Sequence, residues 1–234
     1  MVIDFKFQNQ LNDRYTFDTF IVGAGNRVAY AVAQAVVQGL GKANTPLVLC
    51  GGVGTGKTHL LHAISHELGR RKPDASVYCS TESLTNVMIS SLKHDKMAGL
   101  LDSLRDIDVL LVDDIQFLAG KERTMEVFSE IFGQLHSKGK QLVLAGCRSP
   151  KELAEIVYSV NIPIELADVI EIFPPDYETM IAILRRKAER ERIMLSEECS
   201  QSIATSVGNV RELEGALTCL AAYASLPGAH SPMR

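Results

Sequence analysis

A glycine-rich octapeptide constrains this chain more than any other stretch: Gly51-Gly52-Val53-Gly54-Thr55-Gly56-Lys57-Thr58. An apolar run over residues 46–50 precedes it, and a helical pattern over 57–70 follows it. Glycine lets the backbone curl closely around a polyphosphate with its N–H groups directed inward. The order strand, glycine loop, helix is the context in which the pattern Gly-x4-Gly-Lys-Thr binds phosphate. The sequence therefore predicts a phosphate-binding loop here rather than an incidental glycine turn.

Two carboxylates extend the expected site. An apolar run, residues 109–112, ends in Asp113 and Asp114, and a buried strand presents such residues at its C-terminal end, beside the phosphate loop. Lys57 would reach the β- and γ-phosphates, while Mg²⁺ would bind Thr58 directly and Asp113 through water. Asp114 would orient or deprotonate the attacking water. The other interpretation, an acidic turn after a strand, is disfavoured because the phosphate loop is also present.

Short apolar runs alternate with helical patterns along most of the chain. Strands are expected at 46–50, 76–80, 107–113, 141–146 and 168–172. Helices are expected at 26–38, 57–70, 82–92 and 122–137. This alternation predicts an α/β fold with a parallel five-stranded sheet and helices on both faces.

The pattern changes after Pro174-Pro175, because only helices are expected beyond it, at 176–191, 196–206 and 209–224. We therefore divide the chain into a nucleotide-binding core, 1–173, and a small all-helical lid, 174–226. Residues 1–20 are expected to form an irregular arm. The tail, 227–234, is expected to be disordered.

The composition of the chain limits the classes of protein to which it could belong. No apolar run in the 234 residues is long enough to span a membrane, and the N-terminus has no secretory signal pattern. The five cysteines are widely spaced without a Cys-x-x-Cys pair, which indicates a reducing, cytoplasmic location and no structural zinc. Because the net charge is −4, any nucleic-acid binding must use a local basic patch.

Two further features have competing interpretations. Arg211 begins the last expected helix and could reach a γ-phosphate, or it could be a surface arginine paired with Glu212 or Glu214.

Three histidines, at positions 59, 62 and 66, share one face of the helix after the loop. Two of them have a spacing that suits a metal, but no third ligand is near, so packing or solvent contact is favoured.

Four segments carry a wider pattern: Leu11 to Gly23, Gly51 to Leu61, Leu111 to Gly120, and Asn209 to Leu217. Residues 112–122 and 209–217 are more specific than the phosphate loop. Together the four segments resemble the AAA+ ATPase module of the DnaA family of bacterial chromosomal replication initiators. The resemblance covers residues 11–226. Unrelated folds also carry the phosphate loop, whereas few would carry all of these segments.

The resemblance implies an ATP-dependent switch that binds ATP or ADP with Mg²⁺. Gly51 to Thr58 correspond to the Walker A loop, Asp113 and Asp114 to the Walker B acids, and Arg211 to the sensor 2 arginine. Lys57, Asp113 and Asp114 are thus implied to be catalytic. Three residues near the N-terminus fall where the family cradles adenine. The full set of implied cofactor-binding residues is Ile21, Val22, Asn26, Gly52, Val53, Gly54, Thr55, Gly56, Lys57, Thr58, His59 and Arg211.

The resemblance also implies contact with DNA, because ATP-bound subunits of the family assemble on origin DNA and help to melt the duplex. Residues 82–104 correspond to a helical insertion that steers assembly and lines a DNA channel. Residues matching positions that contact the backbone of single-stranded DNA are Ile89, Lys121, Arg123 and Thr124. Such phosphate contacts give sequence-tolerant, salt-sensitive binding. Without the resemblance, the charges at 121–123 would be interpreted as a solvated helix start.

The sequence departs from the family pattern in three ways. Residues 156–166, where the family presents an arginine finger to a neighbouring subunit, contain no Arg or Lys; Pro163 aligns with the finger and Ser159 with a second arginine. The sensor 1 position, normally an aspartate, is Cys147, and a thiol is a poor hydrogen-bonding group. The family's duplex-reading C-terminal domain and helicase-recruiting N-terminal domain have no counterpart in this sequence. Because a missing finger can cost orders of magnitude in turnover, the expected ATPase is weak at most.

Two functions are compatible with these features. The first, favoured because Asp113 and Asp114 are both retained, is an ATP-binding initiator module with weak hydrolysis, which switches assembly with other DnaA-type subunits and binding of single-stranded DNA at the origin. The second is a non-hydrolysing regulatory paralogue that binds ATP and caps or inhibits initiator assemblies. A small-molecule kinase would need an arginine-bearing lid, which 150–184 lacks. The insertion and the Arg211 segment disfavour a helicase loader.

Overall fold

The computed structural model describes residues 11–39, 45–160 and 167–224. The chain divides into two compact units. The first comprises Met1–Phe20, Val28–Gly51 and Gly56–Ile172, and the second comprises Ile21–Arg27, Gly52–Thr55 and Phe173–Arg234. The tail expected at 227–234 lies outside the described residues. No helix in the described ranges is long and apolar enough to cross a membrane.

The first unit is built on a parallel five-stranded sheet with the order β2-β3-β4-β1-β5. Its strands are β1 (Leu47–Gly51), β2 (Ser76–Ser80), β3 (Val109–Asp113), β4 (Gln141–Gly146) and β5 (Asp168–Ile172). The predicted α/β class and parallel sheet are confirmed, and each strand lies within two residues of its expected span. Only the third expected strand was too long, because pairing of β3 begins at Val109.

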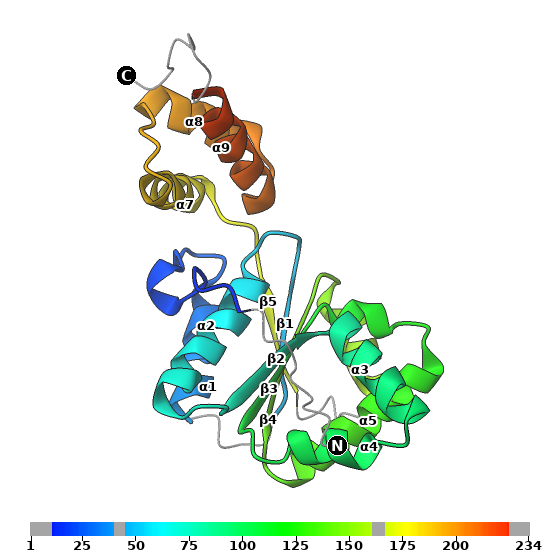
Figure 1. Cartoon of the computed structure of the whole chain (residues 1–234). Coiled ribbons are helices and arrows are strands. Elements are labelled where there is room, and N and C mark those ends of the chain that lie inside the picture. The colour runs from blue at the N-terminus through cyan, green and yellow to red at the C-terminus, as the bar shows by residue number, and fades with distance from the viewer. Residues whose placement is uncertain (1–10, 40–44, 161–166, 225–234) are drawn as a thin grey trace. The chain divides into compact units, whose positions relative to one another are not determined.

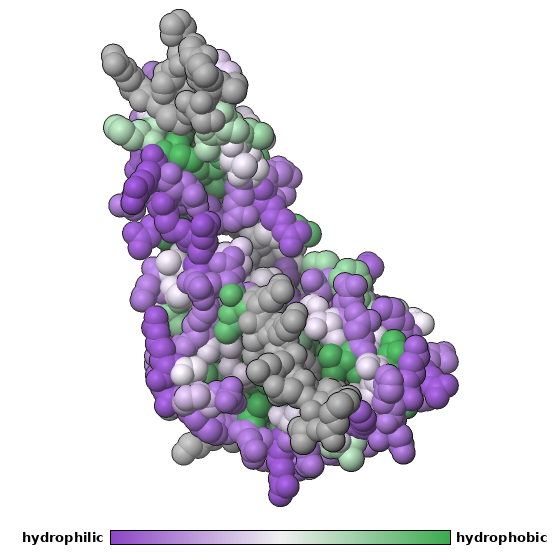
Figure 2. All heavy atoms as spheres, in the orientation of Figure 1, coloured by the Kyte–Doolittle hydropathy of each residue, from purple (hydrophilic) through white to green (hydrophobic). Residues whose placement is uncertain are grey.

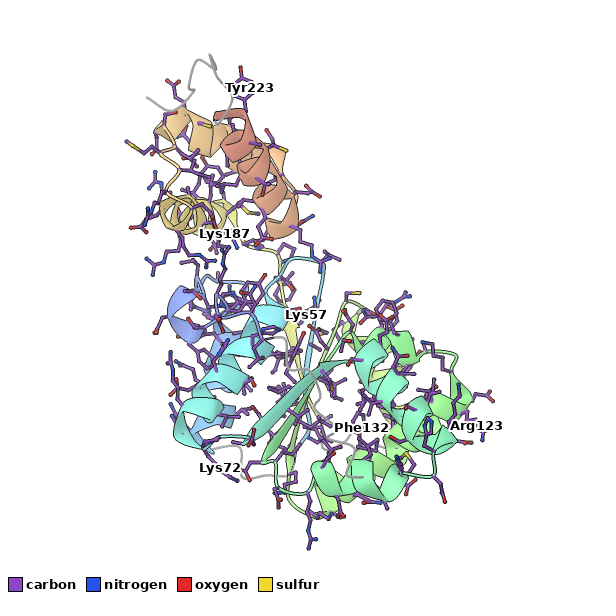
Figure 3. All side chains as sticks on the ribbon, in the orientation of Figure 1. Lys57, Lys72, Arg123, Phe132, Lys187 and Tyr223 are labelled. Atoms are coloured by element: carbon purple, nitrogen blue, oxygen red, sulfur yellow. The ribbon has the colours of Figure 1, made fainter. Side chains whose placement is uncertain are left out.

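Successive residues of the central strands point to opposite faces of the sheet, as the two-residue repeat of a strand requires. Leu47 and Leu49 of β1 belong to one apolar cluster, whereas Val48 and Cys50 belong to the other. Both faces are therefore buried, which is why the strands read as continuous apolar runs rather than as alternating ones. Phe132 is part of the second of these clusters and is 1% exposed (Figure 3).

Helices cover both faces of the sheet (Figure 1). One face is covered by α1 (Arg27–Gln38) and α2 (Lys57–Arg71). The other is covered by α3 (Thr81–Lys93), α4 (Met97–Ser103), α5 (Glu122–Ser137) and α6 (Pro150–Ser159). Two short 3-10 helices, η1 (Phe17–Thr19) and η2 (Ile115–Leu118), complete this unit. The outer surface of these helices that is visible in Figure 2 is mostly hydrophilic. Neither α6 nor η1 was expected from the sequence.

The helices of the second unit are α7 (Tyr177–Arg190), α8 (Glu197–Ser206) and α9 (Val210–Ala224). They enclose a small apolar core that includes Met180, Leu184 and Leu213. Ion pairs such as that of Lys187 with Glu214 lie on their surface. The helical pattern expected after Pro174-Pro175 is thus present in the described residues.

Three histidines of α2 hold the N-terminal arm. The Asn12 backbone N–H donates to His62 Nδ1 at 2.8 Å, and His66 Nε2 lies 3.1 Å from the Asn12 carbonyl oxygen. His59 Nε2 lies 2.8 Å from the Thr16 carbonyl oxygen, and the His59 ring stacks on Tyr15. The shared helical face of these residues therefore packs against the arm. No cluster of three or more metal-ligating side chains occurs among the described residues.

Burial fixes His62 in its neutral form. Its side chain is 4% exposed, and its Nε2 atom has no hydrogen-bond partner among the described residues. Because Nδ1 accepts the Asn12 N–H, the ring proton must be on Nε2, and a second proton would remove that acceptor. Burial lowers the pKa of His62 to about 4, and neighbouring His66 and His59 act in the same direction.

We expect the free energy of unfolding to fall as the pH drops from 6.5 towards 4, because the unfolded chain binds a proton at His62 there and the folded chain does not. At pH 5 the loss is about 1–2 kcal/mol. Urea denaturation at pH 7 and pH 5 measures it. His62→Asn, which retains an acceptor near the Nδ1 position, should lose this part of the pH dependence, whereas a variant of the exposed His94 should keep it. An unchanged pH dependence in His62→Asn would contradict the assignment.

Candidate nucleotide-binding site

Three strands end side by side at one edge of the sheet. The pairing places Cys50 of β1 beside Gly146 of β4, and Leu144 of β4 beside Val112 of β3. The phosphate loop leaves β1 at this edge, and Asp113 is the last residue of β3. The carboxyl ends of parallel strands are where α/β sheets bind ligands. The sheet therefore brings together the phosphate loop and Asp113, which are far apart in the sequence.

Two glycines of the loop adopt backbone angles that other residues avoid. Gly54 has φ 77° and Gly56 has φ 103°, both in the left-handed region. Gly56 precedes α2, and its carbonyl oxygen accepts the Leu60 N–H at 3.0 Å. A Cβ atom at Gly56 would lie 2.8 Å from the ring of Phe20. Glycine is thus required for the loop to enter the helix, whose N-terminus favours an anion.

Lys57 is the first residue of α2 and is only 7% exposed. Its ammonium group donates to the Gly51 carbonyl oxygen at 2.8 Å, so the side chain folds back over the loop (Figure 3). The lysine predicted to reach the phosphates is therefore buried at the loop itself.

Asp113 and Thr58 meet as a divalent-cation site requires. The Thr58 hydroxyl donates to Asp113 Oδ2 at 2.6 Å. Burial raises the pKa of the Asp113 carboxyl, and the Asp114 charge adds to this effect, whereas the Thr58 hydrogen bond opposes it. Mg²⁺ prefers oxygen ligands and a few carboxylates. The paired hydroxyl and carboxylate therefore fit the Mg²⁺ that the sequence predicts.

Two side chains of the site were not found from the sequence. Tyr78 of β2 donates its hydroxyl to Asp113 Oδ2 at 3.4 Å, and its ring packs edge-on against His62. Burial, followed by the Asp113 charge, raises the pKa of Tyr78. Gln116 donates from Nε2 to Asp114 Oδ1 at 2.8 Å. Only the strand order could have indicated Tyr78, because β2 pairs with β3 far along the sequence.

The middle of the loop, Gly52–Thr55, belongs to the second unit. Within that unit a Cβ atom at Gly54 would lie 3.2 Å from the Val210 nitrogen and 3.3 Å from the Arg211 nitrogen. The loop and the start of α9 are therefore in close contact there. The Arg211 side chain is exposed and pairs with neither candidate glutamate in the described residues: Glu212 accepts from Gly208 and Asn209, and Glu214 from Lys187.

The predicted adenine residues form a turn in the same unit. Asn26 donates from Nδ2 to the Ile21 carbonyl oxygen at 3.0 Å and accepts the Gly23 N–H at 2.9 Å. Asn26 is buried, whereas Val22 is 47% exposed. The Asn26 side chain thus shapes the turn, and Val22 is the residue that offers apolar surface. His59, also predicted to bind cofactor, uses its ring to hold the arm, as described above.

A model of the bacterial DnaA ATPase domain matches residues 11–165. The chain belongs to this family. Domain III of the Thermotoga maritima replication initiation protein DnaA is 38% identical with a TM-score of 0.84, over 91% of this chain and 90% of that chain. A DnaA bound to AMPPCP and single-stranded DNA is 34% identical, with a TM-score of 0.80. AMPPCP-bound DnaA from Aquifex aeolicus is 33% identical, with a TM-score of 0.79.

These solved structures differ in how much of each protein the present chain spans. It is covered over 91% of its own length by both AMPPCP-bound structures, but it spans only 66% and 67% of those chains. Membership of the DnaA family therefore concerns the ATPase module. The resemblance to DnaA-family initiators that the sequence motifs indicate is therefore confirmed for the ATPase module.

The residues predicted to contact DNA lie on α3 and at the start of α5. Ile89, on α3, is 43% exposed. Lys121 and Arg123 are exposed at the start of α5, where Thr124 is half-buried. Arg123 extends outward from this helix (Figure 3).

The segment that would carry the arginine finger is only partly described. Ser159 is the last residue of α6. Pro163 lies outside the described residues. Cys147, which is predicted to occupy the sensor 1 position, is exposed, and its backbone N–H donates to Gln116 Oε1 at 3.1 Å.

We expect Gly56→Ala to destabilise the protein by about 2 kcal/mol, because a non-glycine residue in this backbone region is strained and its Cβ would meet the Phe20 ring. That ring cannot move freely, since Tyr30 and His59 pack against it. Gly69→Ala, in the last turn of α2 where a Cβ atom would meet nothing within 4 Å, is the matched control and should stabilise by about 0.5–1 kcal/mol. Thermal and urea denaturation measure both, and equal effects of the two variants would refute the argument.

Proposed function

We propose that this chain is the ATP-binding module of a replication initiator, which uses ATP to switch its assembly and its binding of single-stranded DNA. The observation that carries the proposal is the 2.6 Å contact between Thr58 and Asp113 at the end of the phosphate loop. It joins a hydroxyl and a carboxylate at the point where a Mg²⁺–polyphosphate would be bound. Membership of the DnaA ATPase-domain family supports it, and relatives bound to AMPPCP are consistent with it.

In this proposal each residue of the phosphate side has one role. Loop N–H groups from 52–57 bind phosphate oxygens, and Lys57 exchanges the Gly51 carbonyl for the β- and γ-phosphates. Thr58 and Asp113 hold Mg²⁺, Asp113 through water. Bound Mg²⁺ supplies positive charge that neutralises the phosphates. Asp114 orients the attacking water or accepts its proton.

The remaining nucleotide contacts are proposed for the second unit. Ile21, Val22 and Asn26 would cradle adenine, for which the exposed apolar surface of Val22 and the ordered turn give support. Arg211 would contact the γ-phosphate and thereby report whether ATP or ADP is bound. Its place at the start of α9, in contact with Gly54 and without an ion pair in the described residues, supports this role. Residues 174–226 would then act as a lid with an apolar core of its own.

Nucleotide binding and turnover test the proposal. We expect tight ATP binding that Lys57→Ala weakens at least tenfold, because it removes the cation that faces the phosphates. Asp114→Asn should retain binding and lower turnover about a hundredfold, and Arg211→Ala should lose the preference for ATP over ADP. Lys72→Ala, which removes a surface cation paired with Asp108, is the control. Equilibrium binding of a fluorescent ATP analogue and phosphate release are measured. Unchanged ATP affinity in Lys57→Ala would refute the proposal.

A second function is favoured by one observation, the absence of Arg and Lys from 156–166. A subunit without a finger could accept one from an initiator but not present one, so it would cap or inhibit an assembly. ATP binding without turnover in any form of the protein would favour this regulatory paralogue. The paralogue would then change the ATPase rate or oligomer size of a full-length initiator on mixing, and no change in either would exclude it.

Binding of single-stranded DNA is proposed to use Ile89, Lys121, Arg123 and Thr124. The exposure of Ile89 on α3, and of Lys121 and Arg123 at the start of α5, supports it. One relative was solved with single-stranded DNA. Since the net charge is −4, the attraction must be local to these cations.

We expect ATP-dependent binding of single-stranded DNA that weakens with salt, because each neutralised phosphate releases counterions. Lys121→Ala and Arg123→Ala should each reduce the slope of log K against log salt by about 0.7. Lys72→Ala, a cation already paired with Asp108, should leave the slope unchanged. Fluorescence anisotropy with a labelled oligonucleotide measures these slopes. Slopes that are the same in all three variants would exclude the proposed surface.

A further inference from the structure

A side-chain amide joins the ends of two strands behind the proposed catalytic acid. Gln116 of η2 donates from Nε2 to Asp114 Oδ1 at 2.8 Å, and its Oε1 accepts the Cys147 N–H at 3.1 Å. A carboxylate can only accept and a backbone N–H can only donate, so the two partners fix which way the amide faces. The end of β4 is thereby connected to the acid that follows β3.

Space for this amide depends on a glycine. Gly146 ends β4, and a Cβ atom there would lie 3.0 Å from Gln116 Oε1 and 2.7 Å from a methyl group of Leu153. A side chain at this position would displace the Gln116 amide or the Leu153 side chain of α6. The close approach of Gln116 to the end of β4 is thus built into the backbone.

Asp114 itself has a strained backbone. Its angles, φ 58° and ψ 41°, lie in the left-handed region, which costs a non-glycine residue about 1 kcal/mol or more. The turn leads directly from β3 into η2, where the Phe117 N–H bonds the Asp114 carbonyl oxygen at 3.1 Å. Strain of this kind persists only where surrounding contacts hold it, and the Gln116 amide is the contact made to the side chain.

The bond uses only one oxygen of the acid. Asp114 Oδ2 has no hydrogen-bond partner in the part of the chain that the structure describes, whereas Oδ1 is held by Gln116. A carboxylate with one oxygen fixed and the other open can orient a water molecule in one direction. The partner from β4 is a backbone N–H, so the side chain at position 147 is not needed for the link.

We propose that Gln116 is a positioning residue for Asp114, which it orients from the end of β4 through the Cys147 backbone. The proposal rests on the proposed function, in which Asp114 acts on the attacking water. Gln116 touches neither the nucleotide nor that water in this role, and it acts only through the carboxylate.

The test separates positioning from general support of the fold. Gln116→Leu, of similar size, should lower the turnover number about tenfold while changing the affinity for ATP less than twofold, because a positioned base contributes to the rate and not to binding. Gln116→Glu keeps an acceptor for Cys147 but sets a carboxylate against Asp114, so it should lose at least as much. Gln134→Leu on α5 is the matched control and should stay within twofold of the wild type.

A double-mutant cycle gives the decisive comparison. In an Asp114→Asn background Gln116→Leu should cause no further loss, because residues that act as one unit are not additive. Equal losses in both backgrounds, or a parallel loss of ATP affinity, would show a merely structural role and overturn the proposal.

If the wild type binds ATP without turnover, the hydrolytic part of the proposed function fails. The contact of Gln116 with Asp114 and Cys147 is then tested by a measurement that does not depend on turnover. Hydrogen exchange of the Cys147 amide in the whole chain then decides it. Gln116→Leu should speed that exchange at least tenfold, whereas Gln134→Leu should not. Exchange that is unchanged in Gln116→Leu would overturn the proposal.

Discussion

Because β1, β4 and β3 run parallel, their C-terminal ends share one edge of the sheet, and the proposed site depends on that alignment. Thr58 and Asp113 are 55 residues apart in sequence, yet their oxygens lie 2.6 Å apart. A shift of β3 by one residue would turn Asp113 to the other face of the sheet and away from Thr58. Since both faces are buried, apolar patterning alone would tolerate such a shift in part. The polar contacts at the strand ends therefore help to define the register that they use.

Elements with a strong local signal could be predicted from the sequence. The strands could be predicted because each is a short apolar run between turn residues. The phosphate loop could also be predicted, because its glycines adopt a conformation that few other residues adopt. The helix α6 was missed although its signal was present: Ser149 and Glu152 form a capping box, and Pro150 stands at the first helical position.

Side-chain contacts between distant strands could not be predicted in the same way. Tyr78 reaches Asp113 because β2 lies next to β3, and Gln116 reaches Cys147 because β4 lies on the other side of β3. Nothing near Tyr78 in the sequence marks it as part of a nucleotide site, and the position of Gln116 two residues after Asp114 does not indicate its contact with Cys147. The histidines of α2 were recognised as one face, but the arm that covers that face could be identified only from the structure.

The departures of the sequence from the family pattern concern different functions. Asp113 is held by Thr58 and Tyr78, and Asp114 by Gln116, so both carboxylates are oriented by side chains of the first unit. Cys147 enters this network only through its backbone N–H, which any residue other than proline would supply. A thiol at that position is therefore compatible with ordered acids. Under the proposed function, the missing basic residues at 156–166 would affect a different site, because the family presents its arginine finger to the ATP of the neighbouring subunit.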